Sequence, residues 1–318
     1  METFLSYIFA DPIPLPWLIQ DTIVLILSLV LVYFIIRYQK RPFITILELV
    51  SFVFLYASIY ENAASVIGLY SFGRSYLMVG SVPLTVPLIE GLILITGFWL
   101  LDKTNLPNWT KPPIIGLFGM LQDFSLDPLA IRQVFETTSG TSARWNWYIH
   151  STDANILDVP VFNFPGWMLI MFYASVCLLI GRSLYKKSGE KLIVGLVYPV
   201  LAMVISLLLM FSPLSTFLLW LEPFYAKGEF IEWVLLAFHL IFPSVLLLIL
   251  WKAQKTKPYT YQDLPIFLIP FVLHLSDITF TILGGFTEIL WIVILASMVH
   301  LALLATFWLF GKKKPKPV

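Results

Sequence analysis

Nine apolar stretches, each close to the length of a membrane-spanning helix, run through almost the whole sequence. They cover residues 17–36, 42–60, 78–101, 113–135, 161–181, 192–212, 231–251, 264–283 and 286–310. A helix needs about 20 mostly apolar residues to cross the hydrocarbon core of a bilayer. The chain is 59% hydrophobic and only 12% charged, about half the charge of a typical soluble domain. The sequence therefore predicts an all-α integral membrane protein, a polytopic bundle of about nine transmembrane helices that forms one domain over residues 1–318.

The basic residues provide an independent test of this topology. Sixteen of the 20 Lys and Arg residues lie in five loops, at residues 37–41, 102–112, 182–191, 252–263 and 311–318. If all nine stretches cross the membrane, these loops share one side, which the positive-inside rule places in the cytoplasm. The fourth stretch contains Asp123, Asp127 and Arg132 and is the least apolar, but omitting it would scatter the basic loops over both sides. We therefore expect a cell-membrane protein with its N-terminus outside and its C-terminus in the cytoplasm.

Several classes of site are not expected. The net charge of +1 gives no reason to expect a nucleic-acid partner. A single cysteine, Cys177, excludes an intrachain disulfide and a metal site built from several cysteines. The sequence contains no nucleotide-binding loop and no flavin or nicotinamide motif, so we expect no cofactor. The N-terminus lacks the basic start and cleavage site of a signal peptide, so the first stretch is expected to be retained.

Two connecting segments differ from ordinary short loops. Residues 214–224 are apolar but too short to cross a bilayer, so we expect them to lie at the interface or to re-enter it. The longest connection, residues 136–160, is polar and aromatic. Long loops in a compact protein are usually functional.

Carboxyl groups within the apolar stretches are the main candidates for chemistry, because ionisable residues inside a membrane are costly and are usually functional or paired. Glu90 and Asp123 are expected near the middle of their helices, and Asp127 lies one turn from Asp123 on the same face. Asp21 and Glu288, near helix ends, are expected to reach water. The site is therefore predicted around Glu90, Asp123 and Asp127.

Asp123 and Asp127 cannot comfortably both ionise in a low dielectric. Either one of them holds a proton, or Arg132 neutralises one. An alternative for Asp127 is that it caps a helix starting at Pro128, which would leave Asp123 unexplained. A carboxylic acid kept protonated in an apolar site can act as a general acid, and a proton-coupled carrier would need the same group.

Three histidines and an aspartate form a second candidate group in the C-terminal stretches. His274 and Asp277 share a helix face, and His239 and His300 lie at a similar depth in the flanking stretches. These residues would either bind a metal ion or hydrogen-bond between helices. We expect hydrogen bonds and no metal site.

Four short motifs resemble those of the carotenoid-biosynthesis membrane protein family, whose characterised members are carotenoid 1,2-hydratases. Residues 80–88, GSVPLTVPL, resemble its G-x-V-P-L-x-x-P-L stretch, and residues 123–128, DFSLDP, its D-x-x-x-D-P signature. A W-x-W element follows at residues 145–147. Residues 160–167, PVFNFPGW, then match P-x-x-N-F-x-G-W. The resemblance covers residues 45–185, and residues 192–310 would be accessory helices.

The resemblance implies an enzyme of the hydro-lyase type, which adds water to a terminal C=C bond of an acyclic carotenoid or related polyprenoid. Its implied partners are a lipophilic isoprenoid substrate, membrane lipid and other membrane enzymes of the same biosynthesis. Asp123, Asp127 and Glu90 would be catalytic. The substrate-binding residues would be aromatic and amide side chains, namely Tyr70, Trp145, Trp147, Asn163, Phe164 and Trp167. The alternative function is a proton-coupled membrane carrier or a lipid-binding membrane protein.

Overall fold

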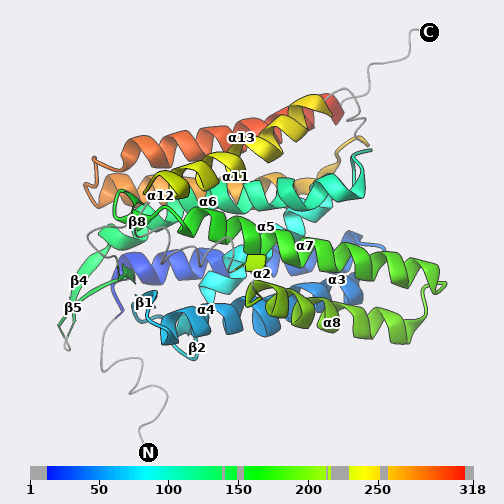
Figure 1. Ribbon diagram of the computed structural model, residues 1–318, viewed down its shortest axis with the longest axis horizontal. Coiled ribbons are helices and arrows are strands. Elements are labelled where there is room, and N and C mark those ends of the chain that lie inside the picture. The colour runs from blue at the N-terminus through cyan, green and yellow to red at the C-terminus, as the bar shows by residue number, and fades with distance from the viewer. Residues whose placement is uncertain are drawn as a thin grey trace, which may run out of the picture.

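The computed structural model of the protein describes residues 13–137, 140–148, 154–212, 214–215, 229–250 and 257–311. Long helices lie roughly side by side in these segments (Figure 1). The helices are α2 (Leu15–Tyr38), α3 (Pro42–Ser51), α4 (Ser58–Val66), α5 (Thr85–Leu101), α6 (Lys111–Arg132), α7 (Asn163–Lys187), α8 (Leu192–Met210), α11 (Glu229–Ile249), α12 (Leu264–Leu283) and α13 (Leu290–Gly311). A π-helical segment, η1 (Phe52–Ala57), joins α3 to α4, so that these three elements form one continuous rod.

Eight of the helical segments in the described part of the chain are long and apolar enough to cross a membrane. The predicted helical bundle is confirmed in these terms. Residues 214–224, expected at the interface or re-entering it, lie almost wholly outside the described residues.

The third apolar stretch is shorter as a helix than predicted. Residues 78–84 do not join it, because Met78–Val79 (β2) and Val82–Pro83 (β3) form a hairpin around Gly80, whose φ of 65° suits glycine. The helix α5 begins only at Thr85 and spans 17 residues, or about 25 Å. All of its residues except Leu88 are buried, so neighbouring helices rather than lipid surround it.

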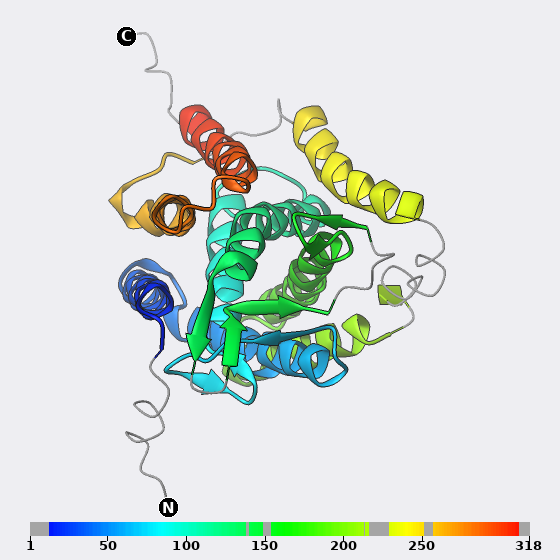
Figure 2. The same cartoon turned by 90° about the vertical axis from the view of Figure 1, so that its left-hand side faces the viewer.

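Short strands cap one end of the bundle, which the all-α prediction did not include. Tyr70–Phe72 (β1) pairs with Trp145–Trp147 (β6), Val134–Thr137 (β4) with Gly140–Ala143 (β5), and Asn155–Ile156 (β7) with Val159–Pro160 (β8). Figure 2 looks onto this end and shows strands in front of the central helices. Backbone groups outside a helix need other partners, and the strand pairs supply them. We call this the hairpin end.

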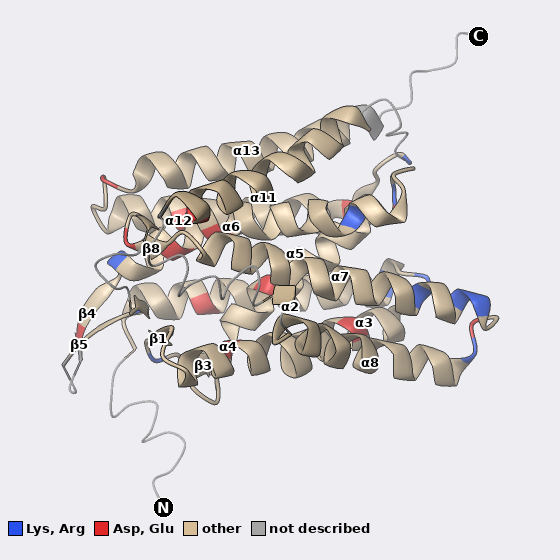
Figure 3. Cartoon of the chain, viewed as in Figure 1, with Lys and Arg blue, Asp and Glu red and all other residues tan. Residues whose placement is uncertain are grey.

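The opposite end carries most of the Lys and Arg residues of the described segments, which are blue in Figure 3. It contains the turns between α2 and α3, between α5 and α6, and between α7 and α8, and we call it the basic end. The three basic loops that the structure describes in full, at residues 37–41, 102–112 and 182–191, are thus gathered at one end, as the positive-inside argument requires.

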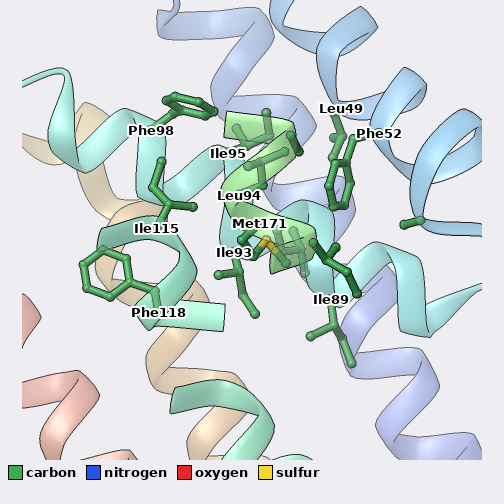
Figure 4. Packing of buried hydrophobic residues seen from close by; sticks show 14 of the residues in the cluster. Leu49, Phe52, Ile89, Ile93, Leu94, Ile95, Phe98, Ile115, Phe118 and Met171 are labelled. Atoms are coloured by element: carbon green, nitrogen blue, oxygen red, sulfur yellow. The ribbon is translucent and has the colours of Figure 1, made fainter. Parts of the chain in front are cut away.

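The helix α6 occupies the centre of the bundle and contacts α5, α7, α11, α12 and α13. All of its residues except Ile131 and Arg132 are buried. Two glycines let α7 approach it closely: a Cβ at Gly116 would lie 2.7 Å from Met168 Cγ, and one at Gly119 would lie 2.8 Å from Met171 Cγ. The central packing of α5 and α6 with their neighbours is apolar and dense (Figure 4). The buried polar side chains in the middle of α6 therefore face neighbouring helices.

Candidate active site

Four buried carboxyl groups converge near the hairpin end from three different elements. Glu61 lies on α4, Glu90 on α5, and Asp123 and Asp127 on α6, and each residue is at most 2% exposed. All four groups interact electrostatically across these helices. Figure 3 shows acidic residues, in red, within the helices. We call these four residues the carboxyl cluster.

The two aspartates share one amide donor. Asn163, at the start of α7, donates from Nδ2 to Asp123 Oδ2 over 2.8 Å and to Asp127 Oδ2 over 2.7 Å. The two aspartates lie four residues apart on α6, so they face the same neighbour. The alternative in which Asp127 caps a new helix at Pro128 is wrong, because α6 continues through Pro128 to Arg132.

No cation neutralises the cluster in the described part of the chain. Arg132, the candidate counter-ion, instead contacts Asp158 over 2.8 Å and Glu288 over 3.1 Å. Among the described residues no Lys or Arg forms an ion pair with any of the four carboxyl groups. Four negative charges inside an apolar protein would be very costly. The cluster must therefore retain protons.

The geometry shows where such protons can be held. Asp123 and Asp127 are neighbours on one face of α6, and Glu61 and Glu90 are neighbours across α4 and α5. Two carboxylates have no proton to donate, so a hydrogen bond within either pair would require one member to be protonated. Both oxygens of Glu90 and one oxygen each of Asp123 and Asp127 have no hydrogen-bond partner among the described residues. The cluster is built as two acid pairs.

Tyr70 joins the cluster to the strands of the hairpin end. Its hydroxyl donates to Glu61 Oε2 over 2.6 Å. Burial, followed by the negative charge of Glu61, raises the pKa of the Tyr70 phenol well above its ordinary value. Tyr70 thus remains a donor over the whole physiological pH range.

Trp147 places a second aromatic ring beside the acids. It pairs with Tyr70 in the β1–β6 ladder, and the two ring centroids lie 4.6 Å apart in an edge-on arrangement. The indole N–H approaches Asp127 without reaching ordinary hydrogen-bond geometry. Trp147 also contacts the Phe162 ring, with centroids 5.9 Å apart. An aromatic wall therefore flanks the aspartate pair.

The other three predicted binding residues occupy different positions. Trp145 is buried and packs on Tyr70 and Phe72. Trp167 is 2% exposed and lies one turn after Asn163 on the same face of α7. Phe164 instead stacks on Phe124, with ring centroids 4.0 Å apart, within a separate apolar cluster. The structure thus gathers Tyr70, Trp145 and Trp147 and separates Phe164 from them.

Glu61 is the residue that the sequence reasoning missed. The predicted second apolar stretch ends at residue 60, one residue before Glu61. The helix in fact continues to Val66. The signal that could have found Glu61 is the return of apolar residues at positions 63–67 with helical spacing.

A second buried polar group lies where α6 meets α12 and α13. Asp277 Oδ2 accepts hydrogen bonds from Ser125 Oγ over 2.7 Å and from Gln122 Nε2 over 2.9 Å. A hydrogen bond of 2.9 Å joins His274 Nε2 to His300 Nδ1. Ser125 and Ser297 each lie 3.1 Å from His274 Nδ1. We call these six residues the histidine network.

The predicted hydrogen bonding between helices is confirmed for His274 and His300. His239 does not join them, because its Nδ1 is bonded to the carbonyl of Leu235 in the preceding turn. In the described residues no group of three or more His, Cys, Asp or Glu side chains is arranged to hold a metal ion.

Asp21 was expected to reach water, and this is wrong. Asp21 is 1% exposed, forms an ion pair of 2.7 Å with Arg144, and accepts hydrogen bonds from Ser75 and Thr85. This contact fixes the segment between β5 and β6 onto α2, and thereby holds Trp145 and Trp147 over the cluster. Glu288 is partly exposed, as expected.

No protein-family model, characterised protein or solved structure matches this chain. The function must therefore be argued from the site itself.

Proposed function

We propose that the carboxyl cluster is the acid site of a membrane hydratase that adds water to a terminal C=C bond of an acyclic carotenoid or related polyprenoid. The observation that carries this proposal is a cluster of four buried carboxyl groups that forms an ion pair with no described cation and lies beside aromatic faces. The motif resemblance at residues 80–88, 123–128, 145–147 and 160–167 supports the same reaction. The substrate is lipophilic and enters from the membrane.

The first step is a proton transfer. The protonated member of the Asp123–Asp127 pair donates its O–H proton to the less substituted alkene carbon. The π electrons form the new C–H bond and leave a tertiary carbocation at the other carbon. Asn163 stabilises the resulting carboxylate through its amide hydrogens, which lie 2.7–2.8 Å from the two aspartates. The acid thus passes its proton to carbon at a site that already supports negative charge.

The cation then needs stabilisation until water arrives. Aromatic faces attract positive charge, and in a desolvated site each contact contributes about 2 kcal/mol. Trp147 and Tyr70 lie next to the acids and are suited to this role, with Trp145 and Trp167 supporting them.

Water completes the reaction. Its oxygen bonds to the cation, and the resulting oxonium ion loses a proton to the aspartate carboxylate, which restores the acid. The net change is alkene plus water to tertiary alcohol. The atoms and electrons balance without a cofactor.

The test is expression in cells that accumulate lycopene, an acyclic carotenoid, with the pigments analysed by mass spectrometry. We expect products heavier by one or two waters. In water labelled with ¹⁸O the new hydroxyl should carry the label, which distinguishes hydration from oxidation by O₂. Unchanged pigment in the presence of folded, membrane-inserted protein would reject this substrate class.

The second candidate is a proton-coupled carrier, and the histidine network is the observation that favours it. Asp277, Ser125, His274 and His300 form a continuous hydrogen-bonded chain across three helices, which suits proton transfer. Purified protein in vesicles containing a pH-sensitive dye would distinguish the two functions. A carrier would acidify the lumen in response to a gradient of its substrate, whereas a hydratase would not.

The orientation in the membrane is part of the proposal. With the basic end in the cytoplasm, a cysteine replacing Lys187 should react with an impermeant maleimide only after cells are permeabilised. A cysteine replacing Ser142, at the hairpin end, should react in intact cells. The native Cys177 is buried and gives a low background. The reverse labelling pattern would show that the basic end faces outward and the hairpin end faces the cytoplasm.

A further inference from the structure

A cleft of about 640 Å³ opens at the basic end, remote from the carboxyl cluster. Its lining comes from the turn between α2 and α3, the ends of α5 and α7, the helix α8 and the segment before α12. Apolar side chains such as Ile44, Ile95 and Phe98 form part of its wall. The volume lies within the range of ordinary ligand sites.

Every acidic residue of this cleft already has a cation. Glu48 makes a two-pronged ion pair with Arg182 and also accepts a hydrogen bond of 2.6 Å from Tyr198. Asp102 contacts Lys111 over 2.7 Å and Arg182 over 3.3 Å. Glu190 pairs with Arg41. The carboxylates thus hold two arginines in place, and the paired cations neutralise their negative charge.

Three lysines remain as excess positive charge. Lys40, Lys186 and Lys257 line the cleft and are exposed. None of their ammonium groups forms an ion pair with a described residue. Lys257 is held there by a backbone hydrogen bond of 2.9 Å to Lys103. Counting the lining residues, five cations face three anions.

The position and chemistry identify the class of ligand. Lysine ammonium groups are strong phosphate binders, and basic pockets at the ends of membrane helices suit anionic lipid head groups. The apolar wall would accommodate the first carbons of a lipid tail while the lysines hold its phosphate. We propose that this cleft binds a phosphate group, carried by an anionic membrane lipid or by a soluble phosphate compound. The proposal does not depend on the hydratase function.

The test measures the melting temperature of the full-length protein in non-ionic detergent. Phosphatidylglycerol, phosphatidylcholine and inorganic pyrophosphate are added separately at equal concentration. Saturating phosphatidylglycerol should raise the melting temperature by about 5 °C, and phosphatidylcholine should leave it nearly unchanged. An equal shift with pyrophosphate would identify a soluble phosphate as sufficient, whereas its absence would identify the lipid as the source.

The variant K40S/K186S/K257S removes the unpaired lysines without touching an ion pair. It should fold, melt close to the wild type without ligand, and lose most of the shift. The matched variant R37S/K187S/K191S removes the same charge from the same end outside the cleft, and should keep the shift. If no phosphate compound raises the melting temperature, or if both variants lose the shift equally, the cleft is not a phosphate site.

Discussion

The carboxyl cluster and the histidine network lie side by side around the central helix α6, yet their polar groups are satisfied very differently. In the histidine network a single carboxylate, Asp277, receives two donors. In the carboxyl cluster four carboxyl groups share the amide of Asn163 and the hydroxyl of Tyr70. Both oxygens of Glu90 are left without a conventional partner.

A buried polar group without a partner costs stability, so such a group persists only where something else requires it. In the histidine network only Gln122 Oε1 lacks a partner among the described residues, and a network satisfied to this extent needs no further explanation than holding helices together. This difference supports the proposal that the carboxyl cluster maintains acids for chemistry, whereas the histidine network fastens α12 and α13 to α6. We therefore expect substitutions in the carboxyl cluster to affect activity and substitutions in the histidine network to affect stability.

The largest expected effect is at Asp123. The substitution Asp123→Asn keeps the shape and removes the transferable proton, so we expect the hydration rate to fall at least about 100-fold. The thermal stability should change little, because a neutral amide replaces a neutral carboxylic acid of the same shape. Both quantities are measured on the purified variant in detergent, with turnover assayed on an acyclic carotenoid. A variant with wild-type turnover would remove Asp123 from the mechanism and leave Asp127 or Glu90 as the acid.

The next largest effect is expected at the aromatic wall. In Trp147→Leu the loss of one cation–π contact of about 2 kcal/mol should lower turnover by about 30-fold. Its control is Trp291→Leu, because Trp291 also lies near the hairpin end but is 56% exposed on α13. That variant should keep turnover within twofold. Equal losses in the two variants would show that the tryptophans act only as membrane anchors.

A smaller effect is expected at Tyr70. Tyr70→Phe keeps the ring and removes the hydrogen bond to Glu61, worth about 1 kcal/mol, so turnover should fall about fivefold. The pH dependence follows from the raised pKa of Tyr70. A phenol is a donor below its pKa, so raising the pKa extends the donor form to higher pH. The rate of the wild type should show no loss from Tyr70 ionisation between about pH 7 and 10. A wild-type step in that interval that is missing in the variant would contradict this account.

The aspartate pair of the carboxyl cluster could be predicted from the sequence, because its geometry depends on a single helix. Asp123 and Asp127 lie on one helix at a spacing that places them together. The contact of Asn163 with both depends on how α7 rotates against α6, which is set by packing at Gly116 and Gly119. No pattern within a single helix encodes that rotation. The partner of Arg132 was unpredictable for the same reason, since Asp158 approaches it only through the β7–β8 hairpin.

Helix ends were the other source of error. Glu90 was expected near the middle of its helix because the apolar run appears to begin at residue 78. The hairpin of β2 and β3 uses the first part of that run, so Glu90 falls in the second turn of α5. That shift brings Glu90 to the level of Glu61, which lies in α4 near its own hairpin-end terminus. The hairpin therefore helps to form the acid pair.

The smallest effect on activity is expected at Asp277, and it decides between the two roles assigned to the polar sites. Asp277→Asn keeps an acceptor oxygen for Ser125 but weakens charge-assisted hydrogen bonds, so stability should fall by about 1–2 kcal/mol. Because Asp277 does not belong to the carboxyl cluster, hydration turnover should stay within about twofold of the wild type. Denaturation of the purified variant and the carotenoid assay measure the two quantities. A proton-coupled carrier would behave in the opposite way: its hydrogen-bonded chain through His274 and His300 would lose a titratable member, and transport would stop while stability changed little. A variant that unfolds more easily but remains active would establish the histidine network as a fastening between helices.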